Sequence, residues 1–176
     1  MSGAIAPGFA TVAALLVVAG ATKVRNPLPA GSALRAIDAP SGRVAVRILG
    51  AAEVALGALC LLWPTAIAAG LLALAYIVFA CFVLLLLRAG GSVPCGCFGA
   101  SAFEPSRLHV AMDLAAAVVA LVAIPSPPPA LFAIASAPVS EVLVLASIAG
   151  ATYLGVLAFA LVPGLWRSWT PERWPG

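Results

Sequence analysis

The 176-residue chain is too apolar to fold as a soluble domain. Apolar residues make up 64% of it, charged residues make up 9%, and its mean hydropathy is +1.16. A soluble domain carries roughly 25% charged residues because its surface must be polar. The nine basic and six acidic side chains cannot cover such a surface, so membrane lipid must contact much of the protein. The net charge of +3 makes no basic stripe, and we expect no nucleic-acid partner.

Five apolar segments are long enough to cross a bilayer as helices, which takes roughly 17–25 residues each. We expect spans at about residues 4–22, 44–63, 65–87, 108–124 and 142–162. Only Trp63-Pro64 separates the second span from the third, which predicts an antiparallel hairpin. The runs are continuous rather than alternating, which favours helices over a barrel. The predicted fold is all-α: a polytopic transmembrane helical bundle of about five spans. It forms a single integral membrane domain, residues 1–176, and ends in a Trp- and Arg-rich interfacial tail, residues 163–176.

Small residues spaced four apart predict places where two helices pack closely in lipid. The pairs are Ala51/Ala55, Ala116/Ala120 and Ala146/Gly150. Since the chain is rich in alanine, this spacing also arises by chance, and it indicates a packed bundle and little more.

Basic residues fall on alternate connections between the predicted spans. The first connection, the third and the tail contain them, whereas the second and the fourth contain none. The positive-inside rule therefore predicts a multi-pass protein of the cell membrane, with its N-terminus outside and its C-terminus in the cytoplasm. The first apolar segment lacks the preceding positive charges of a signal peptide, so we expect it to be a retained span.

The segment after the third span contains Cys95-Gly96-Cys97 in a turn rich in Gly and Pro. A disulfide between these thiols would close a small strained ring, and strained disulfides exchange readily. Cys95 and Cys97 are therefore candidate catalytic residues for thiol–disulfide exchange. Two other interpretations stay open, a structural or incidental pair and a pair of zinc or copper ligands. A metal would need further ligands, such as His109, and we assign no metal site.

Cys81 lies late in the third predicted span, near the end that leads to Cys95. It is a candidate relay of electrons to Cys95 or Cys97, or a small apolar filler of the bundle. Cys60 lies near the opposite membrane side, so we expect no disulfide between Cys60 and Cys81.

Ionisable residues lie within or at the ends of the apolar segments, where burial is costly unless they are paired or line a polar cavity. They are Lys23, Arg47, Glu53, His109 and Asp113. The predicted spans place four of them toward the membrane side of the Cys95 turn, with Glu53 deeper. One interpretation is a polar pocket that carries protons or binds a quinone or a peptide, although the sequence requires no cofactor. The other is an ion pair that fixes the bundle, between Glu53 and either Lys23 or Arg47.

Three segments of the sequence carry a family resemblance. They are Ala21-Thr22-Lys23-Val24-Arg25-Asn26-Pro27, Ala52-Glu53-Val54-Ala55-Leu56-Gly57 and Pro94-Cys95-Gly96-Cys97-Phe98-Gly99. Together they resemble the MauE family of methylamine-utilisation membrane proteins, within the DoxX-like group. The similarity covers roughly residues 4–124. Met112-Asp113 departs from the Arg-Asn or Arg-Asp step of the family, so a role for that arginine does not transfer.

The resemblance implies a DoxX-like four-helix core with one extra C-terminal helix. It also implies a role in methylamine metabolism or, more generally, in helping a periplasmic partner form its disulfides. A thioredoxin-like or disulfide-containing protein is the implied partner. Cys95 and Cys97 would be the exchanging pair, and Lys23 and Glu53 the buried polar pair. Oxidative folding favours cysteines that face the exterior, whereas the charge rule places them in the cytoplasm. The membrane side on which Cys95 and Cys97 lie therefore stays open. Two alternatives to a thiol–disulfide oxidoreductase also stay open: a non-catalytic membrane subunit or scaffold, and a metal-binding membrane protein.

Overall fold

The computed structural model describes residues 2–90, 105–130 and 146–158, and this part of the chain is helical without strands. The helices are α1 (Ser2–Arg25), α2 (Leu28–Arg35), α3 (Arg43–Leu62), α4 (Ala66–Arg88), α5 (Arg107–Val122) and a further helix, Ala146–Ala158. The predicted all-α membrane fold is confirmed.

Three of the described helices, α1, α3 and α4, are long and apolar enough to cross a membrane. The predicted fourth span corresponds to α5, which has 16 residues and is therefore shorter than these three. After α5 the chain reaches Pro125, and no helix forms from there to residue 130, because prolines interrupt the backbone hydrogen bonding of a helix. Of the predicted fifth span, residues 146–158 are helical, whereas its ends and the predicted tail lie outside the described residues.

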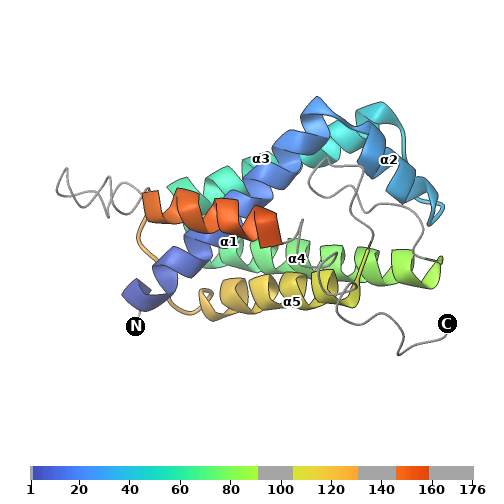
Figure 1. The fold of residues 1–176 in the computed structure, drawn as a ribbon. Coiled ribbons are helices and arrows are strands. Elements are labelled where there is room, and N and C mark those ends of the chain that lie inside the picture. The colour runs from blue at the N-terminus through green and yellow to red at the C-terminus, as the bar shows by residue number, and fades with distance from the viewer. Residues whose placement is uncertain (1, 91–104, 131–145, 159–176) are drawn as a thin grey trace.

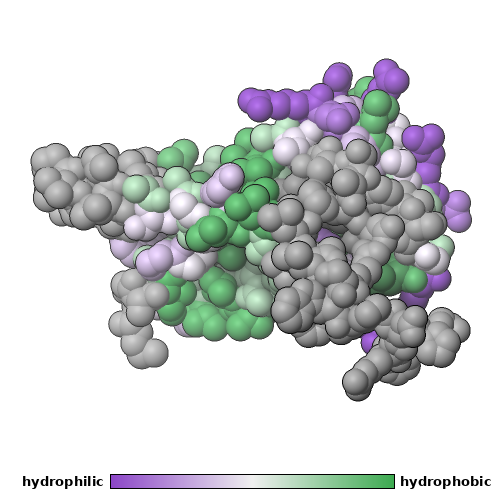
Figure 2. Space-filling view, in the orientation of Figure 1, coloured by the Kyte–Doolittle hydropathy of each residue, from purple (hydrophilic) through white to green (hydrophobic). Residues whose placement is uncertain are grey.

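The helices are associated mainly as two pairs, α1 with α3 and α4 with α5 (Figure 1). The hairpin predicted at Trp63-Pro64 joins α3 to α4. Thr65 caps α4, and its hydroxyl accepts a hydrogen bond from the backbone N–H of Ala68 over 3.1 Å. The side chains along the middle of the molecule are hydrophobic, and hydrophilic ones gather at the end formed by α2 (Figure 2). This distribution is typical of a protein that contacts lipid around its middle.

The residues between the first two predicted spans, expected to be a simple connection, contain the short helix α2. Pro27 precedes α2 and Pro29 lies in its first turn, where the missing N–H of proline costs nothing. One face of α2 is buried through Ala30, Gly31 and Ala33. The segment after it turns at Asp38, which has a positive φ of 57°. At eight residues, α2 is too short for its apolar pattern to stand out in the sequence.

Glycines bring α1 and α3 into close contact where the two helices cross. A Cβ atom added to Gly50 would lie 2.6 Å from the carbonyl oxygen of Gly20, and one added to Gly57 would lie 2.7 Å from that of Ala13. These distances leave no space for a larger residue, so the two backbones touch.

The predicted small-residue pairs are only partly used for packing. Ala116 and Ala120 are buried, as a packing pair should be. The alanines of the α3 pair, Ala51 and Ala55, are exposed, and so are Ala146 and Gly150. These two pairs do not pack within the described part of the bundle, because alanine is common on lipid-facing surfaces as well as between helices.

We expect Gly50→Ala to weaken the bundle, because the added methyl group would push α1 away from α3. Overpacking of this kind costs about 1–3 kcal/mol in the free energy of unfolding. Gly70→Ala in α4 is the matched control, since its Cβ would meet nothing closer than Ile124 Cδ1 at 4.0 Å. Thermal unfolding of the purified protein in detergent measures both variants. Equal unfolding temperatures for the two variants would contradict the tight crossing.

Candidate functional site

Lys23 and Glu53 form an ion pair inside the bundle. The Lys23 ammonium donates a hydrogen bond of 2.7 Å to Glu53 Oε2, and each residue is only 5% exposed. Lys23 lies in the last turn of α1, and Glu53 lies about 15 Å along α3 from its start, calculated from the helical rise. Gly20 and Gly50 lie one turn away from the pair on the same two helices, so the close crossing positions the two charges.

Helix α4 adds an aromatic face to this pair. The Lys23 ammonium lies 5.2 Å from the centre of the Phe79 ring, a distance at which a cation is attracted to the ring face. Phe79 packs edge-to-face on Tyr76, with ring centres 5.8 Å apart. The Tyr76 hydroxyl donates a hydrogen bond of 2.6 Å to the carbonyl oxygen of Val12 in α1. Polar and aromatic contacts therefore connect α1 to both α3 and α4.

The pair leaves hydrogen-bonding capacity unused within the described part of the chain. There, Glu53 Oε1 is buried and has no hydrogen-bond partner. The three N–H groups of Lys23 make one hydrogen bond there, to Glu53 Oε2. An unsatisfied buried polar atom is costly, and at intramembrane sites such atoms often mark a place for a ligand or water.

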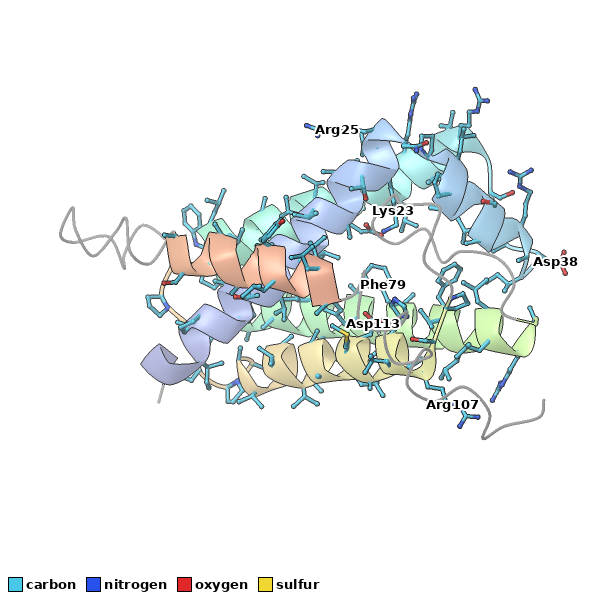
Figure 3. All side chains as sticks on the ribbon, viewed as in Figure 1. Lys23, Arg25, Asp38, Phe79, Arg107 and Asp113 are labelled. Atoms are coloured by element: carbon cyan, nitrogen blue, oxygen red, sulfur yellow. The ribbon has the colours of Figure 1, made fainter. Side chains whose placement is uncertain are left out.

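Helix α5 contributes two more of the predicted polar residues, His109 and Asp113, both buried. The Ser106 hydroxyl lies 2.8 Å from His109 Nδ1, and Ser106 also caps the start of α5. Figure 3 shows Asp113 turned toward the interior of the bundle, as are Lys23 and Phe79, whereas Arg25 and Asp38 extend outward.

The structure does not bring Arg47 into this group. Arg47 is exposed in the first part of α3, and the ion pair that the sequence left open is made by Lys23. The physical reason is the direction of the side chains: the buried stripe of α3 contains Val46, Gly50 and Glu53, and Arg47 lies beside that stripe.

The candidate catalytic pair, Cys95 and Cys97, lies outside the described residues. The segment that contains it leaves α4 at Arg88 and enters α5 at Arg107, so it connects the two helices at the end of the bundle where α1 also ends (Figure 1). Cys81 is a free, exposed cysteine on α4 rather than a filler of the core. Cys60 is free and buried, with its sulfur 3.5 Å from the carbonyl oxygen of Ala68. The described residues contain no cluster of three or more metal-binding side chains.

The aromatic residues Tyr76, Phe79 and Phe82 could not be identified as site residues from the sequence. In an apolar span, an aromatic residue is no signal by itself, because it is equally common against lipid. Ser106 had a recognisable signal, since a serine directly before an apolar helical segment is a preferred N-cap.

These features define a helical membrane protein with an ion pair buried at a glycine-lined helix crossing. The family model for methylamine utilisation protein MauE matches residues 3–126, which include the whole of α2 to α5 and nearly all of α1. The chain belongs to the MauE family, as the resemblance predicted. It is therefore a membrane protein of a family involved in methylamine utilisation. No curated protein and no solved structure matches the chain.

We expect Lys23→Met to destabilise the bundle, because it leaves the Glu53 carboxylate buried without its partner. Breaking a buried pair costs about 3–5 kcal/mol, whereas replacing both charges with apolar residues is often neutral. The double variant Lys23→Met/Glu53→Leu should therefore unfold at nearly the temperature of the unmodified protein. Thermal unfolding in detergent measures both variants, and additive losses in the double variant would show that the two charges are not coupled.

Proposed function

We propose that the protein is a membrane thiol–disulfide redox or maturation factor that acts on a partner protein through Cys95 and Cys97. The observation that carries the proposal is the Cys95-Gly96-Cys97 motif itself, in a chain whose family is involved in methylamine utilisation. Helix α4 ends at Arg88 and α5 begins at Arg107 on the side of the bundle where α1 ends, and Lys23 lies in the last turn of α1, which supports a common site (Figure 1). The partner would be a thioredoxin-like or other disulfide-containing protein.

One round of exchange conserves two electrons, because the Cys95–Cys97 disulfide is the oxidant and the partner's dithiol is the reductant. A further round needs an electron acceptor from the membrane pool to re-form that disulfide. A thiolate of the reduced partner attacks the Cys95–Cys97 disulfide, which forms a mixed disulfide and releases one cysteine as a thiolate. The second thiolate of the partner then attacks the mixed disulfide. The partner leaves with a disulfide, and Cys95 and Cys97 remain reduced. Arg88 and Arg107, at the two ends of the connection, would favour the thiolate forms electrostatically.

The buried polar residues would have a supporting role in this function. Lys23 and Glu53 hold α1 against α3, while His109 and Asp113 lie in the first part of α5, directly after the connection. Cys81 remains a candidate relay, and its exposure on α4 leaves its thiol accessible from the surface of the bundle.

We expect the single variants Cys95→Ser and Cys97→Ser to form a mixed disulfide with the oxidised partner. The remaining thiolate attacks the partner's disulfide and releases one partner thiolate, and no second cysteine lies beside it to complete the exchange. Non-reducing electrophoresis of membranes, followed by mass spectrometry of the reducible band, measures the adduct. The double variant should give no such band, and Cys60→Ala should behave like the unmodified protein. If both single variants fail to form an adduct and the double variant sustains growth on methylamine, the protein is a non-catalytic subunit.

We expect Cys95 and Cys97 to react with a membrane-impermeant thiol reagent from the cytoplasmic side, as the charge rule predicts. The structure supplies matched controls in a background without other cysteines. Arg35→Cys lies at the same end of the bundle, whereas Trp63→Cys is exposed between α3 and α4 at the other end. If the reagent labels both Cys95 and the Arg35→Cys variant from outside the cell, the orientation of the protein is the opposite of the predicted one.

A further inference from the structure

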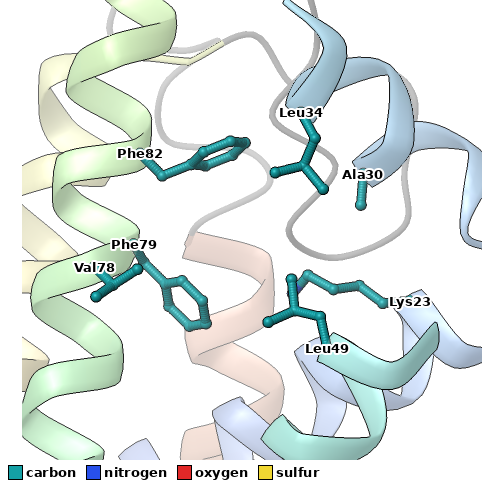
Figure 4. A pocket seen from close by; sticks show the side chains of 7 residues that line it. All are labelled: Lys23, Ala30, Leu34, Leu49, Val78, Phe79 and Phe82. Atoms are coloured by element: carbon teal, nitrogen blue, oxygen red, sulfur yellow. The ribbon is translucent and has the colours of Figure 1, made fainter. Parts of the chain in front are cut away.

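A pocket of about 110 Å³ lies between α4 on one side and α1, α2 and α3 on the other (Figure 4). Its walls include Lys23, Leu34, Leu49, Val78, Phe79 and Phe82. An engineered apolar cavity of about 150 Å³ takes up benzene. At about 110 Å³ the pocket is smaller than that cavity, so it has space for part of a ligand no larger than about one six-membered ring.

Two of the described side chains that line the pocket are also exposed on the apolar surface of the protein. Leu49 of α3 and Val78 of α4 line it and are 41% and 54% exposed, whereas Lys23 lies buried at its inner side. A ligand from the membrane would therefore enter between α3 and α4, and its tail would stay in lipid. Because the described residues that line the pocket are apolar apart from Lys23, a strongly hydrated molecule would lose its water there without compensation.

Lys23 is the charged residue among the described residues that line the pocket, and its ammonium is the candidate hydrogen-bond donor to a ligand. It has N–H groups beyond the one bonded to Glu53, and it lies over the face of Phe79, which also lines the pocket. Since Glu53 balances its charge and leaves one oxygen unpaired, the site does not favour an anion. It favours a neutral molecule with a hydrogen-bond acceptor, and a flat ring suits the walls formed by Phe79 and Phe82.

From this geometry we propose that the pocket binds the ring of a membrane-soluble quinone, with a ring carbonyl oxygen accepting a hydrogen bond from Lys23. A lipid acyl chain would fill the same apolar walls, but it offers the ammonium no acceptor. The pocket binds the quinone whether or not Cys95 and Cys97 exchange disulfides.

Two probes with the same tail test the proposal on the full chain, purified in detergent and freed of bound quinone. Decylubiquinone carries ring carbonyls, and decylbenzene carries none. Isothermal titration should give a dissociation constant for decylubiquinone at least about tenfold lower than for decylbenzene, which is the effect of one hydrogen bond to a charged group. Equal affinities would overturn the proposal and identify a site for acyl chains.

A variant of Val78, an exposed residue that lines the pocket, tests whether decylubiquinone binds there. Val78→Trp should weaken decylubiquinone binding at least about tenfold, because the indole would fill the opening from a side chain that already faces lipid. Leu84→Trp is the matched control, since Leu84 is similarly exposed on α4, at 41%, and does not line the pocket. If Val78→Trp binds decylubiquinone as the unmodified protein does, the pocket is not the site.

Two further variants test whether the Lys23 hydrogen bond, rather than the folding of the bundle or the chemistry of Cys95 and Cys97, determines quinone binding. Lys23→Met/Glu53→Leu should bind both probes with similar affinity, since the donor is gone and the charges are removed together. A retained preference of this folded variant for decylubiquinone would overturn the role of Lys23. The double variant Cys95→Ser/Cys97→Ser should bind decylubiquinone normally, so a failure of quinone binding and a failure of disulfide exchange are measured independently.

Discussion

The burial of one ammonium group, that of Lys23, constrains the arrangement of α1, α3 and α4. A charge at this depth is stable only if it is paired and hydrogen-bonded, and Glu53 provides both contacts. The carboxylate reaches Lys23 because Gly20 and Gly50 let the backbones of α1 and α3 touch. In a membrane, apolar burial gives helices little reason to associate, so this close packing and the polar contact together determine which helices pair.

The bundle is divided into two helix pairs, α1 with α3 and α4 with α5. Helix α4 packs closely with α5, and it contacts the α1–α3 pair through a few larger side chains, notably Tyr76 and Phe79. Bulky aromatic contacts hold two backbones apart, whereas glycine contacts bring them together. The pocket lies where the aromatic contacts separate the units, beside the lysine that the glycine contacts position.

Much of the fold could be predicted from the sequence, because long apolar runs leave helices as the only structure that satisfies the backbone in lipid. The family and the buried polar pair could be predicted from local motifs around Lys23 and Glu53. The positions of the charges alone left Arg47 and Lys23 equally available to Glu53, whereas the resemblance to the MauE family implied Lys23, and the crossing of α1 and α3 gives the physical reason. The faces through which the helices pack could not be predicted from the sequence. Gly50 contacts α1, whereas its neighbour Ala51 is exposed, and an almost uniformly apolar segment gives no signal that distinguishes a packed position from an exposed one.

The two interpretations of the intramembrane charges, an ion pair that fixes the bundle and a pocket that binds a ligand, therefore do not exclude one another. An ammonium group has three donors, and structural pairing with Glu53 uses one of them. Pairing also fixes the position and cancels the charge of the group, which makes Lys23 a rigid, neutralised donor rather than a mobile cation. A donor of that kind recognises a neutral acceptor without attracting anionic lipid, and its position at the inner side of the pocket follows from the same helix crossing that buries it.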